Sequence, residues 1–263
     1  MSHPTSGPDI LVCVKRVVDA TGEVVLTADG QAVDGRYAGF TMSNHEECAV
    51  ELAVRTAAAT DGRASVLTLG DADAVEQLRA ALAVGCTAAT HVEADAGAFG
   101  PADVAREIAA VVRDHESAGR PHDLVLLGND AADSGDFQVG IRLAYELGRP
   151  VVNGAATLTV EDGEVVAGVK GPEGRETYRV PLPAVVTVLE GGVEPRYPTV
   201  PGRMKAKKVE IEQRPPSTTP SGPQRTRLRL PPPQPSEVEI LGKGADAAPA
   251  VVDLFERLGV VAR

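Results

Sequence analysis

Short apolar runs alternate with helical stripes along residues 10–147. The apolar runs, bounded by polar residues or glycine, are residues 10–14, 65–69, 91–92 and 124–127. The stripes, in which apolar side chains recur every three or four positions, are residues 44–59, 73–84, 101–111 and 138–147. Such runs are typical of buried strands, and such stripes of amphipathic helices. Strands and helices that alternate in series predict an α/β fold with a parallel sheet covered on both faces.

The pattern changes beyond residue 150. Two turn signals, Asp162-Gly163 and Gly171-Pro-Glu-Gly174, separate runs in which apolar and polar residues alternate. These runs predict an antiparallel extension, and the last run, residues 184–188, is apolar enough to return to the main sheet. A further short hairpin is predicted at residues 21–34, before the first helix.

The C-terminal part of the chain has a different character. Residues 203–208 are basic and show no core pattern, and eight of the twenty prolines lie in residues 215–236, which we expect to be extended. Residues 247–258 predict a short amphipathic helix, which docks either on its own domain or on a partner chain. The predicted divisions are an α/β domain at 9–212, a proline-rich arm at 213–236 and a segment with a docking helix at 237–263.

Composition excludes several classes of protein. A net charge of −11 argues against nucleic-acid binding, which needs a basic surface. The cysteines, Cys13, Cys48 and Cys86, are odd in number and far apart, which suits a reducing compartment rather than a disulfide framework or thiolate metal site. No apolar run approaches the roughly 20 residues of a membrane span. We therefore expect a cytoplasmic protein that is not embedded in a membrane.

Residues 124–140 are the most informative candidate for binding chemistry. A buried strand, a polar loop with glycines and a helix start follow one another, and this order builds anion sites in open α/β sheets. An ordinary strand–helix loop has the same local pattern. Asp130, Asp133 and Asp136 lie in this loop, but aspartates there more often make turns than hold magnesium. The chain has no glycine-rich phosphate motif, no nucleophile pair and no metal-ligand spacing, so we predict no catalytic residue and no metal.

Six stretches carry a resemblance to a known family, in order along the chain. They are Ile10-Leu-Val-Cys-Val-Lys-Arg-Val17, Leu78-Arg-Ala-Ala-Leu-Ala-Val-Gly85, Asp123-Leu-Val-Leu-Leu-Gly128, Leu182-Pro-Ala-Val-Val186, Glu194-Pro-Arg-Tyr197 and Met204-Lys-Ala-Lys-Lys208. Together they resemble the beta subunit of electron-transfer flavoproteins. The resemblance implies a Rossmann-like, parallel-sheet nucleotide-binding domain of the adenine nucleotide alpha-hydrolase type, with an antiparallel extension and an extended C-terminal arm.

The resemblance also implies a function. A beta subunit of this kind forms a heterodimer with an alpha subunit and is an electron carrier, not an enzyme in its own right. FAD is held mainly by the alpha subunit, and the beta subunit holds AMP, or a second FAD in members that bifurcate electrons. Electrons arrive from flavin dehydrogenases and leave to a membrane quinone reductase. A stand-alone adenine-nucleotide sensor with the same fold is the alternative from another class.

Site residues follow from the resemblance at the end of the first strand, the start of the first helix and the loop after residue 130. The implied nucleotide contacts are Cys13, Ser43, Asn44, His45, Glu46, Leu69, Ala131, Asp133, Ser134, Gly135, Asp136, Phe137, Gln138, Val139 and Gly140. Phe137 stands where small polar residues are usual, so it either narrows the pocket or stacks on a base.

Partner recognition is implied for a second set of residues. These are Val193, Glu194, Pro195, Arg196 and Tyr197. The family usually places a leucine anchor before this motif, whereas Gly191-Gly192-Val193 precedes it here. Either the anchor is missing or Val193 replaces it.

Overall fold

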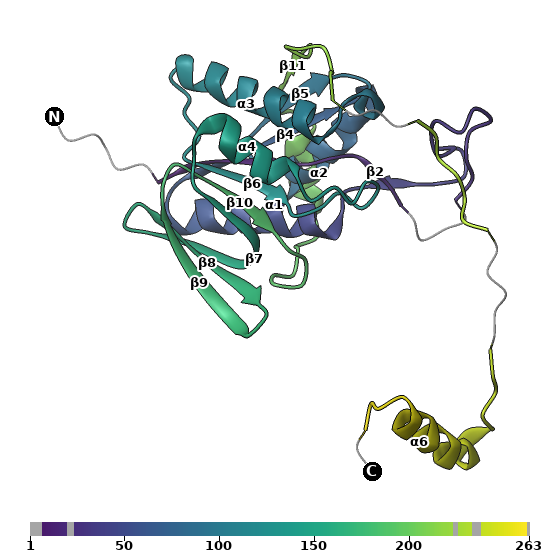
Figure 1. The fold of residues 1–263 in the computed structure, drawn as a ribbon. Helices are drawn as coiled ribbons and strands as arrows, with labels where there is room; N and C mark the ends of the chain where they lie inside the picture. Colours follow the sequence, from purple (N-terminus) through teal and green to yellow (C-terminus); the bar gives the residue numbers. More distant parts are fainter. Residues whose placement is uncertain (1–6, 20–23, 223–225, 233–237, 262–263) are drawn as a thin grey trace. The chain divides into compact units, whose positions relative to one another are not determined.

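The computed structural model describes residues 7–19, 24–222, 226–232 and 238–261. The chain divides into two compact units, residues 1–228 and residues 229–263. Figure 1 shows the first unit as a sheet with helices packed on it.

A nine-stranded sheet forms the centre of the first unit, in the order β11-β5-β4-β1-β6-β10-β7-β8-β9. Its strands are β1 (Asp9–Cys13), β4 (Arg63–Gly70), β5 (Ala88–Glu93), β6 (Leu124–Gly128), β7 (Val151–Glu161), β8 (Glu164–Gly171), β9 (Gly174–Pro181), β10 (Ala184–Val188) and β11 (Ile211–Arg214). Neighbours from β11 to β7 pair in parallel, whereas β7, β8 and β9 pair antiparallel. The predicted parallel sheet, the antiparallel extension and the return of residues 184–188 to the main sheet are confirmed.

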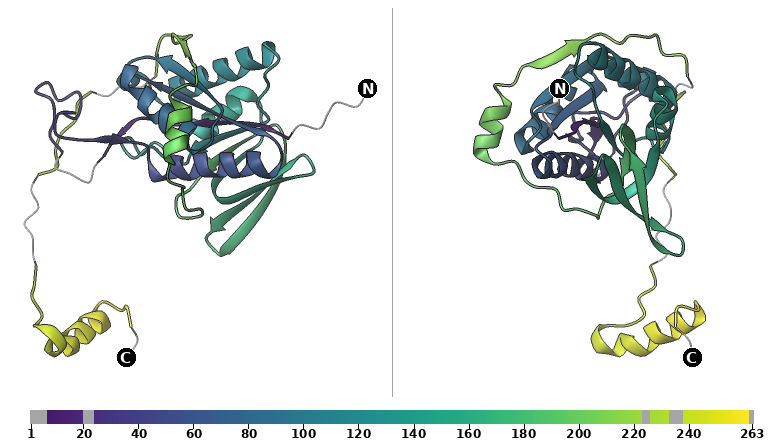
Figure 2. Two further views of the ribbon diagram at one scale, coloured as in Figure 1. Left: turned by 180° about the vertical axis from the view of Figure 1, so that it is seen from behind. Right: turned by 90° about the vertical axis from the view of Figure 1, so that its left-hand side faces the viewer.

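Helices cover both faces of this sheet, as predicted (Figure 2). They are α1 (Asn44–Ala59), α2 (Val75–Val84), α3 (Pro101–Ser117), α4 (Val139–Leu147) and α5 (Val200–Ala206), with 3-10 turns at Ala72–Ala74 and Ala96–Ala98. Alternate residues of a strand face opposite sides: Ile10 and Val12 pack with α1 and α2, whereas Leu11 packs with α3 and α4. The result is two apolar layers, one on each face.

Helix α1 begins at a capping box. Ser43 Oγ accepts from the main-chain N–H of Glu46 at 3.3 Å, and Glu46 Oε2 accepts from the N–H of Ser43 at 3.0 Å. Asn44 also has a glutamate three residues further on, Glu47, but it is the first residue of the helix and Ser43 is the cap. This reciprocal bonding satisfies two N–H groups that a helix start leaves open.

Residues 200–214 form two elements that the apolar pattern did not predict. Helix α5 is capped by Thr199, whose Oγ1 accepts from Gly202 N at 3.1 Å, and β11 adds to the edge of the sheet beside β5. The Arg79 guanidinium on α2 donates to the carbonyls of Ala206 and Val209, which ties this segment to the body. Such short, polar elements depend on tertiary hydrogen bonds and leave no periodic signal.

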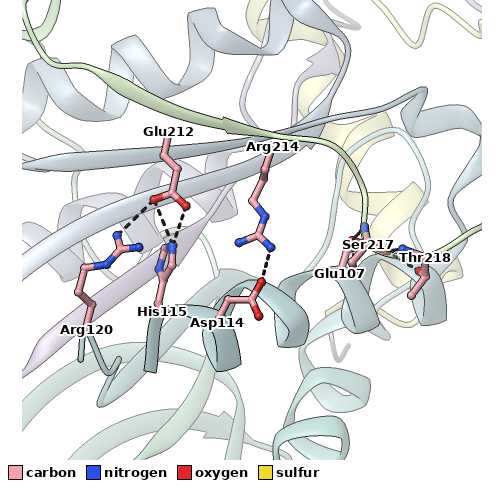
Figure 3. A network of polar contacts seen from close by, with 8 residues as sticks. All are labelled: Glu107, Asp114, His115, Arg120, Glu212, Arg214, Ser217 and Thr218. Carbon is pink, nitrogen blue, oxygen red and sulfur yellow. Dashed lines mark hydrogen bonds and ion pairs between the residues drawn. The ribbon is translucent and has the colours of Figure 1, made fainter. Parts of the chain in front are cut away.

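Polar contacts hold residues 212–222 against α3 (Figure 3). The Glu107 carboxylate accepts from the main-chain N–H groups of Ser217 and Thr218, each at 2.7 Å. Arg214 pairs with Asp114 further along the helix. Residues 215–222, the first part of the proline-rich stretch, therefore form no helix or strand and are fixed to the domain by the carboxylates of α3.

The predicted hairpin at residues 21–34 is reduced to a single antiparallel bridge between Leu26 and Val33. Residues 20–23 lie outside the described part of the chain. Two short strands, β2 (Val17–Val18) and β3 (Phe40–Thr41), pair at the base of this insertion.

The second unit contains helix α6 (Ala248–Arg257), which confirms the predicted C-terminal helix. Within this unit its apolar side chains are uncovered: Val252 is 50 % exposed, Phe255 42 % and the following Leu258 65 %. Across the described residues of both units, the helices are too short or too polar to cross a membrane.

Candidate functional site

A cleft opens at the carboxyl ends of β1, β4 and β6. The chain leaves β1 for β4 and β5 on one side and returns to β6 on the other, so the strand order reverses at β1. In open α/β sheets ligands bind at such a switch point, because the loops on either side diverge and leave a crevice. The fold thus places a binding crevice beside the strand–loop–helix stretch 124–140.

Apolar and polar groups line different parts of this cleft. The apolar walls come from the strands and from the start of α3, and include Leu67, Leu69, Phe99, Val104 and Ile108. The polar part comes from the strand ends and the loop before α4, and includes Lys15, Glu46, Asn129, Asp130, Ser134, Asp136 and Gln138. A flat apolar slot with a few convergent polar groups is typical of a small-molecule site.

Glu46 is a buried carboxyl group at the wall of the cleft, 5 % exposed. Burial raises its pKa to about 7, against the hydrogen bonds from Ser43 and Lys15 that lower it. Lys15 N donates to Glu46 Oε1 at 2.7 Å, so this side chain also ties the end of β1 to α1. Near neutral pH the carboxyl group of Glu46 is therefore present in both its protonated and its ionised form.

Cys13 lies at the end of β1 in the same cleft and is 6 % exposed. Burial, followed by the charge of Glu46, raises the pKa of its thiol. The group therefore stays protonated and acts as an apolar surface rather than as a nucleophile.

The loop before α4 has a backbone that is costly for ordinary residues. Gly135 has φ +63° and Phe137 has φ +53°, in the left-handed region that favours glycine. Phe137 lines the cleft with its side chain 56 % exposed. Lys15 Nζ meets Asp133 Oδ1 at 2.7 Å, which joins this loop to the end of β1.

The structure brings most of the expected nucleotide contacts together. Those that line the cleft are Cys13, Glu46, Leu69, Ala131, Ser134, Asp136, Phe137, Gln138, Val139 and Gly140. Asp133 and Gly135 belong to the same loop, and Ser43 Oγ donates to the carbonyl of Asp130 at 3.3 Å. Asn44 and His45 point elsewhere: Asn44 lines a second cavity, and His45 Nδ1 accepts from Glu190 N at 2.9 Å.

Sequence reasoning missed the wall that α3 supplies. The missed lining residues include Val14, Lys15, Ala96, Phe99, Pro101, Val104, Ile108, Asn129 and Asp130. Lys15 and Asn129 directly follow strands whose carboxyl ends meet, so their positions carried a signal. Phe99 and Ile108 looked like ordinary loop and core residues, and only the packing of α3 over β1 and β4 reveals them.

The second cavity lies beside the expected partner-recognition motif. It is lined by Asn44, Glu47, Cys48, Glu190, Gly191, Gly192, Val193, Glu194 and Pro195. Val193 itself is partly buried and packs against the core, and its carbonyl accepts from the Cys48 thiol at 3.3 Å. Tyr197, by contrast, is 91 % exposed.

Metal ligation finds no support in the described part of the chain, where no group of three or more histidine, cysteine or carboxylate side chains is arranged to hold an ion. His115 and His122 do meet, with Nδ1 and Nε2 2.9 Å apart, although their spacing in the sequence gave no metal motif.

Gly140 is expected to be required for the shape of the cleft. A Cβ at this position would lie 2.2 Å from Thr187 Cγ2, and Thr187 Oγ1 is held by an N–H from Gly154 at 2.8 Å. Gly140→Ala should therefore push the start of α4 away and destabilise the protein by about 2 kcal/mol. Urea unfolding measures the loss. Adding Thr187→Ser, which removes the methyl and keeps the hydroxyl, should restore most of it; an equally unstable double variant would contradict the steric explanation.

A Rossmann-like α/β protein with a crevice at its switch point is the class that fold and site define. A family model for the electron transfer flavoprotein domain matches residues 32–219. Electron transfer flavoprotein subunit beta of Bacillus subtilis (strain 168) is 32% identical over 209 residues, 78% of each chain. The human subunit beta is 36% identical, covering 77% of this chain and 79% of its own, and that of Mycobacterium leprae (strain TN) is 35% identical over 77% of each. The chain belongs to the electron transfer flavoprotein family.

Proposed function

We propose that this chain is the beta subunit of a heterodimeric electron-transfer flavoprotein. It carries electrons from flavin dehydrogenases to a membrane quinone reductase through FAD held with an alpha subunit, and it is not an enzyme in its own right. The observation that carries the proposal is similarity to beta subunits over 77–78% of the chain. A location in the cytoplasm remains part of the proposal.

The cleft is proposed to hold an adenine nucleotide, and AMP is the leading candidate for this ligand. The part of the cleft lined by Leu69 and Phe99 is apolar and suits a flat base. The start of α4 at Gln138 and Val139 lines the same cleft, and the N–H groups of a helix start bind phosphate. A second FAD, as in a bifurcating subunit, is the alternative occupant. Counting flavin and AMP released per heterodimer separates the two: two flavins would favour bifurcation.

The end of the arm and the terminal helix are proposed to dock on the alpha subunit. Of the division expected from the sequence, a domain at 9–212, an arm at 213–236 and a docking segment at 237–263, this proposal keeps the docking segment, whereas residues 213–222 of the arm are held on α3 of the domain. The exposed apolar side chains of α6, such as Val252 and Phe255, support the proposal, because an uncovered apolar helix face marks an interaction site.

The loop at Val193–Tyr197 is proposed to meet the dehydrogenase. Val193 packs against the core and does not present an anchor, so it is a poor replacement for the family's leucine. The exposed ring of Tyr197 serves instead as the hydrophobic anchor for the dehydrogenase. Glu194, Pro195 and Arg196 complete the proposed recognition loop, whose backbone is tied to α1 by the bonds from Arg196 to Glu51.

Co-expression with an alpha subunit tests the main proposal. The full chain should purify as a yellow 1:1 complex with flavin absorbance, and a chain truncated after residue 236 is the matched control. We expect the truncated chain to form the complex at least tenfold more weakly while its domain keeps its unfolding midpoint. Colourless chains that do not associate would refute the proposal. A stable monomer that binds AMP without a partner would favour the stand-alone sensor.

A further inference from the structure

Lys15 is the one cationic side chain among the described residues that line the cleft. Its main chain is fixed, because its N–H donates to Glu46 Oε1 at 2.7 Å. Its ammonium group lies 2.7 and 2.8 Å from the two carboxylate oxygens of Asp133. The ion pair therefore joins the wall of the cleft to the loop that leads into α4.

The other ionisable groups of the cleft are acidic. Asp130 and Asp136 line it, and so does Glu46, whose pKa is raised to about 7 by burial. A phosphate bound at the start of α4 would meet these charges, and the partial positive charge of one helix end is small beside them. Arg142, on α4, does not line the cleft, and its guanidinium donates to Gln138 Oε1 at 2.8 and 3.0 Å. Among the described residues that line the cleft, Lys15 is thus the one side chain with a full positive charge that a bound phosphate can contact.

The Lys15–Asp133 pair is suited to exchange. Its side chains are 31 % and 25 % exposed, and ion pairs that water reaches contribute little to stability. A phosphate offers the same ammonium more negative charge than one carboxylate does. Release of Asp133 from Lys15 also allows the loop to relax. Phe137 in this loop has φ +53°, a left-handed backbone conformation that costs free energy.

We propose that Lys15 is the cation that recognises the phosphate in this cleft, and that Asp133 competes with the phosphate for it. The proposal rests on the adenine-nucleotide site proposed above and names the pair of residues that sets its preference for a phosphorylated ligand. Binding of a nucleoside monophosphate exchanges the carboxylate of Asp133 for the phosphate and frees the loop. A nucleoside without phosphate leaves the ion pair intact.

AMP and adenosine titrated into the heterodimer of the full chain with an alpha subunit, freed of AMP, test this exchange. Lys15→Met should weaken AMP binding about tenfold, the loss of one charged hydrogen bond, and change adenosine binding less than twofold. Asp133→Asn should tighten AMP binding about threefold, since Lys15 no longer has a competing partner. The double variant should bind AMP as Lys15→Met does, because the gain requires the lysine.

Two matched variants separate this effect from general charge. Glu146→Gln removes an acid from α4 outside the cleft, and Arg142→Met removes a cation from the same helix; both should change AMP affinity less than the paired residues do. Two results would contradict the exchange but not the nucleotide site. One is that Asp133→Asn weakens AMP binding; the other is that it tightens AMP binding equally in a chain that also carries Lys15→Met. If the unaltered chain binds neither AMP nor adenosine, the proposed nucleotide site is wrong, and the exchange with it.

Discussion

Replacing Arg196 with alanine is expected to lower the free energy of unfolding by about 3 kcal/mol, because it leaves a buried carboxylate without its main partner. Glu51 is 2 % exposed, and its two oxygens accept from the Arg196 guanidinium at 2.8 and 2.9 Å. Arg55 supplies a further contact from one turn along α1. Burial alone would raise the pKa of Glu51, but the bonds from Arg196 and Arg55 outweigh it and the pKa lies below its usual range.

Urea unfolding of matched variants checks the origin of this loss. Arg196→Lys should recover only part of it, because an ammonium cannot bridge both oxygens as the planar guanidinium does. Arg196→Ala combined with Glu51→Leu should be more stable than Arg196→Ala alone, since the unpaired charge is then gone. If the single variant loses less than about 0.5 kcal/mol, the ion pair behaves as an exposed one and the prediction is wrong.

Acidification is expected to destabilise the protein through His122. This side chain is 7 % exposed, and burial, followed by the neighbouring His115, lowers its pKa to about 4. The folded state therefore resists the proton that the unfolded chain accepts near pH 6.5. The stability that neutral His122 contributes is present above about pH 6.5 and is lost as the pH falls through 4, about 3 kcal/mol in all.

The groups around His122 explain why it must be neutral. Its Nε2 lies 2.9 Å from His115 Nδ1, so one ring has to accept where the other donates, and two protonated rings would repel (Figure 3 shows His115). The charge of Asp9 raises the pKa of His122, whereas the smaller effects of Arg149 and Arg120 lower it further. On its other side His115 meets Glu212 of β11 at 3.3 Å.

His122→Gln, which can still bond to His115, provides the comparison. Between pH 7 and pH 4 the unaltered chain should lose about 3 kcal/mol more than this variant does, measured by urea unfolding at each pH. The histidine ring resonances should titrate near the same pH in the folded protein. Parallel stability curves for the two chains would show that His122 does not govern the acid transition.

Local pattern predicted those parts of the fold that bury a regular face. The strand at Leu124–Gly128 and the helix from Val139 could be recognised because each hides a continuous apolar surface. Helix α5 and strand β11 could not, because they are short and rely on contacts such as the bonds from Arg79 to the carbonyls of Ala206 and Val209. Residues without a buried face of their own gain their structure from neighbours distant in the sequence.

The candidate site also has one part that the sequence predicted and another part that depends on tertiary packing. The loop from Ala131 to Gly140 follows a predicted strand, so its place at the carboxyl edge of the sheet was foreseeable. Phe99, in the turn before α3, and Ile108, on α3, face the same cleft, and no local pattern reveals that this part of the chain packs there. The resemblance implied His45 as a nucleotide contact, together with the other residues at the start of the first helix. In the structure its Nδ1 accepts from Glu190 N, because neighbouring residues on a helix point in different directions.

By itself the sequence determined the class of fold, the order of the strands and helices that bury an apolar face, the family, and the strand–loop–helix stretch at residues 124–140. These depend on apolar periodicity and on motifs, which are local. The tertiary structure alone decided that Lys15 meets Asp133, that Glu51 holds Arg196, that His115 meets His122, and that Val193 lies inward while Tyr197 is exposed. Each of these depends on which side chains meet in space, and the free energy of burying or pairing a charge is set by that environment, not by its neighbours in the chain.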